Sequence, residues 1–465
     1  MAETSSSSRS SSNGSPMTNI TQDHLFAILL LLPIDSILSF AMTCKRFRAL
    51  ASSDALWESI SRRDWGPNSV DALKKSSNLL FQHQQQQLPW MRLYKHVSQL
   101  DSVSLHKLTY PDTHLALPRP RASHSLNFVS DYLVLFGGGC EGGRHLDDTW
   151  VAYIGKDFQK ILNWQKVNSG IPSGRFGHTC VVICDFLVLF GGINDNGSRQ
   201  NDTWVGQLTC HETLGISLSW RLLDVGSVAP PARGAHAACS IDNRLMLVHG
   251  GIGLNGLRMG DTWVLELTEN FCSGEWREIL TCPSPAARSG HSLTCIEGTK
   301  IVLFGGRGLG YEVLNDVWVL DISESYLNWV QILYELPNIP EGVSLPRVGH
   351  SATVILGGRV LIYGGEDSQR HKRDDFWVLD ISANPSITVQ PSTLNSARLL
   401  AKMWKRLKAI GHKPKCRSFH RACTDDSGRY LYVFGGMVDC LVQPAESTGL
   451  GFDGELFLVE LLLQL

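Results

Sequence analysis

The sequence has little of the cysteine and histidine spacing that holds structural zinc. Its 465 residues include 12 Cys, but no CxxC pair and no tight Cys/His cluster occurs. Four cysteines instead follow a recurring histidine by two to four residues, inside apolar stretches of strand type: Cys180, Cys239, Cys295 and Cys423. We expect these to be unpaired thiols in a core, which fits the cytosol or the nucleus better than an oxidising compartment.

Charge of one sign and long apolar runs are also absent. The formal net charge is -2, from 42 Lys+Arg against 44 Asp+Glu, so the composition does not favour a nucleic acid or a membrane as the main partner. The most apolar run near the N-terminus, residues 25–34, is shorter than the roughly 20 residues that cross a bilayer. Asp23 and His24 precede it where a secretory signal carries basic residues. We therefore predict a cytoplasmic and/or nuclear protein.

Three different compositions follow one another in the first hundred residues. Residues 1–17 are Ser-rich and without periodicity, which predicts a disordered tail. Residues 18–65 carry apolar residues at helical spacing, which predicts a small helical domain with Thr21 capping its first helix. We interpret residues 66–102 as a polar linker, with a glutamine run at 84–87, followed by a short helical extension from Pro89.

From about residue 103 a repeat begins, and four marks define it. They are Arg-x-x-His, an aromatic residue (once His249) before Gly-Gly, Asp-x-Trp, and a trailing Trp before an apolar pair. The steps between successive repeat histidines are 54, 58, 55, 59 and 70 residues, the last lengthened by an insertion at about 382–401. The first mark occurs six times: Arg121/His124, Arg175/His178, Arg233/His236, Arg288/His291, Arg347/His350 and Arg417/His420.

A period near 50 with Gly-Gly and spaced aromatic residues resembles the kelch repeat. Each cycle holds four apolar stretches separated by turn residues, which is typical of one four-stranded blade of a β-propeller. The last cycle lacks a trailing Trp, and Leu105 stands in that place before the first cycle, so we expect strand 103–109 to close the ring. The resemblance implies an all-β, six-bladed kelch β-propeller over residues 103–465. We place its repeats at about 118–170, 171–229, 230–285, 286–340, 341–410 and 411–465.

The helical domain resembles an F-box. The resemblance rests on Leu25, Ile28-Leu29, Leu32-Pro33, Ile37-Leu38, Cys44-Lys45-x-Phe47, Leu50 and Leu56-Trp57. Members of that family bind a Skp-type adaptor, and through it a cullin-RING ligase, with an exposed apolar face. The resemblance implies that the adaptor would be bound by Leu25, Leu29, Leu32, Pro33, Ile34, Leu38, Cys44, Lys45 and Phe47.

These two resemblances together predict an interaction protein and not an enzyme, namely the substrate receptor of an SCF-type ubiquitin ligase. A kelch scaffold without a ligase role is one alternative, and a metal-dependent kelch enzyme is another. The iron-type spacing of plant specifier proteins, Glu-x-x-x-Asp-x-x-x-His, begins at Glu312 and Asp316 but has Leu320 in the His place. We expect the arginines and histidines of the first mark to make hydrogen bonds between blades, and the histidines not to bind metal. Some plant receptors add a light-sensing flavin domain. The residues before the F-box are too few and too polar for one, so we predict no cofactor.

The target should bind where loops between strands two and three emerge, beside the loops that join one blade to the next. Residues 370–373 form a basic cluster there, which could meet an acidic target segment. A solvated loop without a role, or binding at the opposite face with the inserted loop, is the alternative. The candidate target-binding residues are Arg144, His145, Arg199, Arg258, Arg307, Arg370, Lys372 and Arg373.

Overall fold

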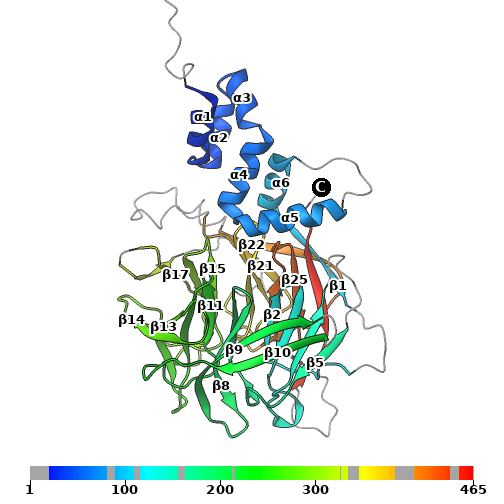
Figure 1. The fold of residues 1–465 in the computed structure, drawn as a ribbon, viewed down its shortest axis with the longest axis vertical. Helices are drawn as coiled ribbons and strands as arrows, with labels where there is room; N and C mark the ends of the chain where they lie inside the picture. Colours follow the sequence, from blue (N-terminus) through cyan, green and yellow to red (C-terminus); the bar gives the residue numbers. More distant parts are fainter. Residues whose placement is uncertain are drawn as a thin grey trace, which may run out of the picture.

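The computed structural model describes residues 20–80, 89–108, 116–154, 163–211, 215–324, 326–333, 345–382, 403–439 and 450–463. A helical module at the N-terminus stands on one end of a propeller of short antiparallel strands (Figure 1). Among the described residues, no helix combines the length and the apolar character needed to cross a membrane. The predicted architecture, a small helical domain followed by a six-bladed β-propeller, is confirmed.

The described residues of the helical module form six helices. These are α1 (Gln22–Leu30), α2 (Ile34–Ala41), α3 (Lys45–Ala51), α4 (Asp54–Trp65), α5 (Pro67–Leu80) and α6 (Trp90–Ser98). Thr21 caps α1, where its side chain accepts a hydrogen bond from the His24 N–H, as its position before the apolar run predicts. Cys44 caps α3 in the same way, because its Sγ accepts from the Phe47 N–H.

Six antiparallel blades of four strands each make the propeller. Blade one holds β2 (Ser125–Val129), β3 (Tyr132–Phe136), β4 (Thr149–Tyr153) and β5 (Trp164–Asn168), with a 3-10 turn η2 (Glu141–Gly143) between its second and third strands. Blade two holds β7 (Thr179–Ile183), β8 (Phe186–Asn194), β9 (Arg199–His211) and β10 (Gly215–Leu222), with the short β6 (Arg175–Phe176) beside β8. Blade three holds β11 (Ala237–Ile241), β12 (Leu245–Ile252), β13 (Arg258–Leu267) and β14 (Gly274–Ile279).

The remaining blades follow the same order. Blade four holds β15 (Ser292–Ile296), β16 (Lys300–Phe304), β17 (Val317–Asp321) and β18 (Trp329–Ile332). Blade five holds β19 (Ser351–Ile355), β20 (Arg359–Tyr363), β21 (Phe376–Leu379) and β22 (Trp404–Gly411). Blade six holds β24 (Arg421–Thr424), β25 (Tyr430–Phe434), β28 (Leu456–Leu461) and, as its outer strand, β1 (Ser102–Lys107). Beside it lies a small sheet of β23 (Arg417–Ser418), β26 (Met437–Asp439) and β27 (Leu450–Phe452).

The strand β1 closes the propeller: it precedes blade one in the sequence but is the outer strand of blade six. It pairs with β28 in antiparallel fashion, and Leu105 lies opposite Val459. In blade one the trailing Trp164 has the same register, opposite Ala152, two residues after the strand-three Trp150. The other edge of β1 pairs in parallel with β22 of blade five, so that blades five and six form one eight-stranded sheet.

A closed ring of main-chain hydrogen bonds surrounds the propeller axis. The residue before each repeat histidine donates its N–H to the carbonyl of its counterpart in the preceding blade, at 2.6–2.9 Å. All of these residues have φ between 54° and 66°, the left-handed region that glycine tolerates best. The ring consists of Ser123, Gly177, Ala235, Gly290, Gly349 and Phe419. Each blade is thereby held to both neighbours at its innermost strand.

The Arg and Asp of the repeat hold the base of each loop between strands two and three. In blade three, Arg233 donates to the carbonyl of Gly250 at 3.0 Å and to both carboxylate oxygens of Asp261 at 2.8 and 2.7 Å. Burial raises the pKa of Asp261, but the hydrogen bonds from Arg233 and Trp263 outweigh burial and hold that pKa below its usual value. The equivalent pairs are Arg121–Asp148, Arg175–Asp202, Arg288–Asp316, Arg347–Asp375 and Arg417–Glu455.

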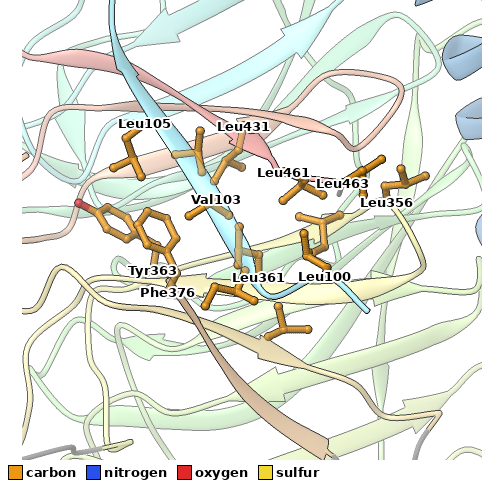
Figure 2. Packing of buried hydrophobic residues seen from close by; sticks show 14 of the residues in the cluster. Leu100, Val103, Leu105, Leu356, Leu361, Tyr363, Phe376, Leu431, Leu461 and Leu463 are labelled. Carbon is orange, nitrogen blue, oxygen red and sulfur yellow. The ribbon is translucent and has the colours of Figure 1, made fainter. Parts of the chain in front are cut away.

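The helical module packs on blades five and six at the end where the β19–β20 turn lies. Arg359 of β20 donates a hydrogen bond to the carbonyl of Val97, and Lys405 donates to the carbonyl of Gln99 at 3.2 Å. Leu100 lies between the module and the propeller, in one buried cluster with Val103 of β1 and Leu361 of β20 (Figure 2). The closure strand β1 and the contact between the helical module and the propeller therefore share one apolar core.

The interpretation of residues 66–88 as a linker is wrong for Pro67–Leu80, which forms helix α5. Its apolar side, with Val70 and Leu73, is buried. Its polar side pairs with α4, since Lys74 Nζ lies 2.6 Å from a Glu58 carboxylate oxygen. The polar residues that make this segment look like a linker include Asp71 and Lys74, which form ion pairs with Arg62 and Glu58 of α4.

Candidate adaptor-binding and target-binding surfaces

The predicted adaptor-binding residues divide into two groups by burial. Pro33, Leu38, Cys44 and Lys45 are exposed, while Leu32 and Ile34 are half-buried. Leu25, Leu29 and Phe47 are instead buried in the core of the helical module, in contact with Ile37, Leu50 and Trp57. The expectation that these three side chains are exposed is wrong, whereas their role in adaptor binding stays a prediction. Leu25 and Leu29 are one helical turn apart, and that face of α1 packs inward against α3 and α4.

Two of the most exposed apolar side chains of the module were missed by the sequence analysis. Leu31 is 85% exposed and Met42 is 80% exposed, at the ends of α1 and α2. With Ile28 they are exposed apolar side chains of α1 and α2, in the part of the module that lies away from the propeller (Figure 1). Leu38 instead lines, with Ile34, a pocket that Gly357 and Arg359 of the propeller also line. The sequence indicates such a surface, because apolar residues occur on all sides of these short helices and one side alone can pack against the core.

The loops between strands two and three emerge at the end of the blades that faces away from the helical module. Strand direction reverses at each turn, so the β20–β21 loop lies at the opposite end of blade five from the β19–β20 turn, which contacts Val97. We call the surface formed by these loops the distal face. The inserted loop at 382–401 lies, except for Ser382, outside the described residues.

The basic residues expected on the distal face do not form a free cationic cluster. Lys372 is buried against Asp439, Arg373 pairs with Asp367, and Arg307 pairs with Glu366 at 2.7 Å. This neutralisation contradicts the expectation of a positive cluster at residues 370–373, in which only Arg370 and His371 stay exposed. Asp367 lies on the same loop as Arg373, while Asp439 and Glu366 lie on loops of neighbouring blades. The repeat pattern of the sequence does not predict these pairs.

The other candidates on this face have mixed surroundings. The ring of His145 lies against Phe176, with centroids 4.5 Å apart and planes tilted by 55°, and its backbone N–H donates to an Asp195 carboxylate oxygen at 2.7 Å, so it joins the loops of blades one and two. Arg199 donates to the carbonyl of Gly197 in its own hairpin. Arg144 is exposed, and Arg258 is half-buried across the loops of blades three and four.

Four large apolar side chains occupy the distal face and were not predicted. Leu254 and Leu257, in the β12–β13 loop of blade three, are 66% and 65% exposed. Leu309 and Tyr311, in the β16–β17 loop of blade four, are 61% and 70% exposed. We call these four residues the loop patch. Their sequence signal was visible, since apolar residues stand in a Gly-rich turn where the other repeats carry polar ones.

Five of the six repeat histidines form hydrogen bonds from blade to blade, as expected, whereas neither ring nitrogen of His124 has a partner among the described residues. His178, His236, His350 and His420 each bond to the hydroxyl that follows the histidine of the preceding blade, at 2.8–3.1 Å. Their pKa values are lowered, chiefly by burial and then by nearby arginines. Within the described ranges, no group of three or more His, Cys, Asp or Glu is arranged to hold a metal ion.

Blade three breaks this pattern and compensates for it. Ala237 stands where blades one, two, four and five have a serine or threonine hydroxyl, so His291 has no hydroxyl to bond. Its Nε2 bonds instead to Nδ1 of His249, at 3.1 Å, and His249 lies directly opposite Ala237 on the neighbouring strand. His249 is the one residue that replaces an aromatic ring before Gly-Gly, so the two departures from the repeat compensate each other.

Both regions of the chain match known protein families. Residues 22–63 match the F-box-like family model, and residues 93–306 and 177–393 match the model described as KLHDC2/KLHL20/DRC7 Kelch-repeats domain. The chain is 59% identical to the F-box/kelch-repeat protein At1g51550 of Arabidopsis thaliana, over 99% of this chain and 95% of that one.

More distant relatives include the putative adagio-like protein 2 of rice, 30% identical over 86% of this chain, and adagio protein 3 of Arabidopsis, 31% identical over 75%. The chain spans 58% and 52% of their respective lengths. The solved structure of YjhT superposes with a TM-score of 0.50 at 15% identity, over 75% of this chain and 95% of that one, which is a likeness of fold. The chain belongs to the F-box/kelch-repeat proteins. Members of this adaptor family are typically non-catalytic, and the F-box implies binding of a Skp1-like adaptor.

Proposed function

We propose that this protein is the substrate receptor of an SCF-type ubiquitin ligase, in which the helical module binds a Skp-type adaptor and the propeller binds the target. The observation that carries the proposal is the separation of two exposed surfaces. Apolar side chains of α1 and α2 lie on the outer helices, and the distal face lies at the far end of the blades. A chain with this arrangement can hold a target near a ubiquitin-charged enzyme without chemistry of its own.

The rigidity of the joint between the two parts supports this role. Helices α5 and α6 share a buried core with β1, β20 and β28, so the module does not hang on a flexible link. Arg359 adds a buried hydrogen bond across the joint. A fixed distance between adaptor and target favours transfer, because effective concentration depends on whether the linked sites can meet.

The test is a calorimetric titration of the full chain with a purified Skp-type adaptor. Leu31→Asp and Met42→Asp place charges on exposed positions, so they should leave the fold intact and weaken the complex at least about tenfold. Leu280→Asp is the matched control, because Leu280 is 83% exposed on the propeller and should not change adaptor affinity. A folded wild-type chain that does not bind the adaptor would remove the ligase role and leave a kelch scaffold.

A further inference from the structure

The loop patch is the most apolar part of the distal face among the described residues. Its members come from two adjacent loops, and each exposes more than half of a large apolar side chain. The corresponding loops of blades one, two and five carry mainly polar residues at their tips, for example Arg144, Asn196 and Arg370. A set of exposed leucines next to an exposed tyrosine is costly in water, and such surfaces usually mark a binding site.

Both loops of the patch are held in a defined shape. In blade three, the Gly253 N–H donates to the carbonyl of Leu257 at 2.9 Å, which closes a tight hairpin. In blade four, the Gly308 N–H donates to the carbonyl of Glu312 at 3.0 Å, and the Tyr311 N–H donates to the carbonyl of Gly308 at 3.1 Å. A preformed surface loses little conformational entropy when a partner binds.

Tyr311 is held in an unfavourable backbone conformation. Its φ is 65°, in the left-handed region that glycine adopts most easily and that is unfavourable for a residue with a large side chain. The guanidinium of Arg258 lies over this ring, with Cζ 4.5 Å from the ring centroid. The ring is therefore fixed from one side and exposed on the other.

Arg258 supplies the charge of this site. Its Nε donates to Ser289 Oγ at 3.0 Å, which joins the loops of blades three and four. No carboxylate of the described residues lies within ion-pairing distance of Arg258, whereas Arg307 and Arg373 are each paired. Its remaining N–H groups can donate to a carboxylate that a partner brings, in the planar geometry that arginine favours.

We propose that the loop patch and Arg258 together bind a segment of the target in which an apolar side chain stands next to a carboxylate. The apolar side chain packs between the leucines and the free side of the Tyr311 ring, and the carboxylate accepts hydrogen bonds from Arg258. This inference rests on the proposed function and makes it more specific. It transfers the site of recognition from the basic cluster of blade five to the junction of blades three and four.

The experiment uses the purified full chain, without adaptor, to select peptides from a displayed library of random twelve-residue sequences. Enriched peptides are expected to combine Leu, Ile or Phe with a nearby Asp or Glu. Selected peptides should bind the Leu309→Ser, Tyr311→Ser variant at least about tenfold more weakly than wild type. The matched control is Tyr326→Ser, since Tyr326 is in the same blade, is 84% exposed, and lies between strands three and four at the opposite end.

A charge exchange tests the orientation. Arg258→Glu should weaken the selected peptides, and replacing their acidic residue with Lys should restore binding to this variant but not to wild type. Peptides that bind the patch variant as well as wild type, or no enrichment at all, would overturn the proposal. So would a wild-type dimer that the patch variant abolishes, because the surface would then serve self-association. Adaptor titration of the same variants keeps the two ideas apart: unchanged adaptor binding with lost peptide binding supports the site alone.

Discussion

The pair Ala237 and His249, whose departures from the repeat compensate each other, can be tested by a double-mutant cycle. His249→Phe installs the aromatic ring that other blades carry before Gly-Gly, so it should fit the space. It also removes the hydrogen-bond partner of the His291 Nε2, which is buried. A buried polar group that loses its partner costs about 1–3 kcal/mol.

The rescue of this variant is the sharper part of the prediction. Adding Ala237→Ser to His249→Phe restores the arrangement of blade four, where Ser292 bonds to His350 at 2.9 Å and faces Phe304. The double variant should recover most of the stability, so the two changes should couple by about 1–3 kcal/mol.

Calorimetric unfolding of the four proteins measures this coupling. With an unfolding entropy of about 2 cal/mol/K per residue, the single variant should unfold about 1 to 4 °C below wild type, and the double variant should return close to it. The reciprocal cycle, Ser292→Ala rescued by Phe304→His, is the control in an ordinary blade. The reasoning fails if His249→Phe unfolds at the wild-type midpoint, or if the double variant is no more stable than the single one.

Three further predictions concern the propeller. Leu105→Ala should destabilise the chain by about 2–5 kcal/mol, because Leu105 is buried in the closure strand, and thermal unfolding should show one lowered transition for the whole propeller and not a local loss. Asp261→Asn should cost about 3–5 kcal/mol by leaving the buried Arg233 without its anion, measured by denaturant unfolding, and an unchanged midpoint would contradict the loop-base role. Burial lowers the pKa of His350 to about 3. Below about pH 6.5 the unfolded chain therefore binds a proton at this residue that the folded chain does not. This group alone should lower the free energy of unfolding by about 2 kcal/mol between pH 7 and pH 5. A His350→Gln variant should show a shallower loss of unfolding midpoint over that range, and an equal loss would refute the assignment.

Much of the propeller could be predicted because its signals are periodic. The Gly-Gly pairs, the Asp-x-Trp marks and the Arg-x-x-His marks recur with one period, and each recurrence corresponds to one blade. The F-box resemblance was likewise carried by local spacing. The expectation that the repeat arginines bond between blades was wrong, because their side chains bond within one blade, from the start of strand one to the start of strand three.

The surfaces were harder to predict, and the residues show why. Leu25, Leu29 and Leu31 are chemically alike in the sequence, yet the first two are buried and the third is 85% exposed. Lys372 and Arg373 look like a free basic pair, but Asp439 and Asp367 neutralise them. Burial and ion pairing depend on which distant residues a fold brings near, and no local pattern carries that information.

The sequence by itself determined the class of fold, the number of blades and the adaptor family, because periodic patterning specifies strands, turns and helices locally. Only the tertiary structure decided which apolar residues face water and which basic residues stay unpaired. The loop patch exists because two Gly-rich turns from blades three and four lie side by side, and Arg258 crosses between them. Such a surface arises from the packing of one blade on the next, and a single repeat does not contain it.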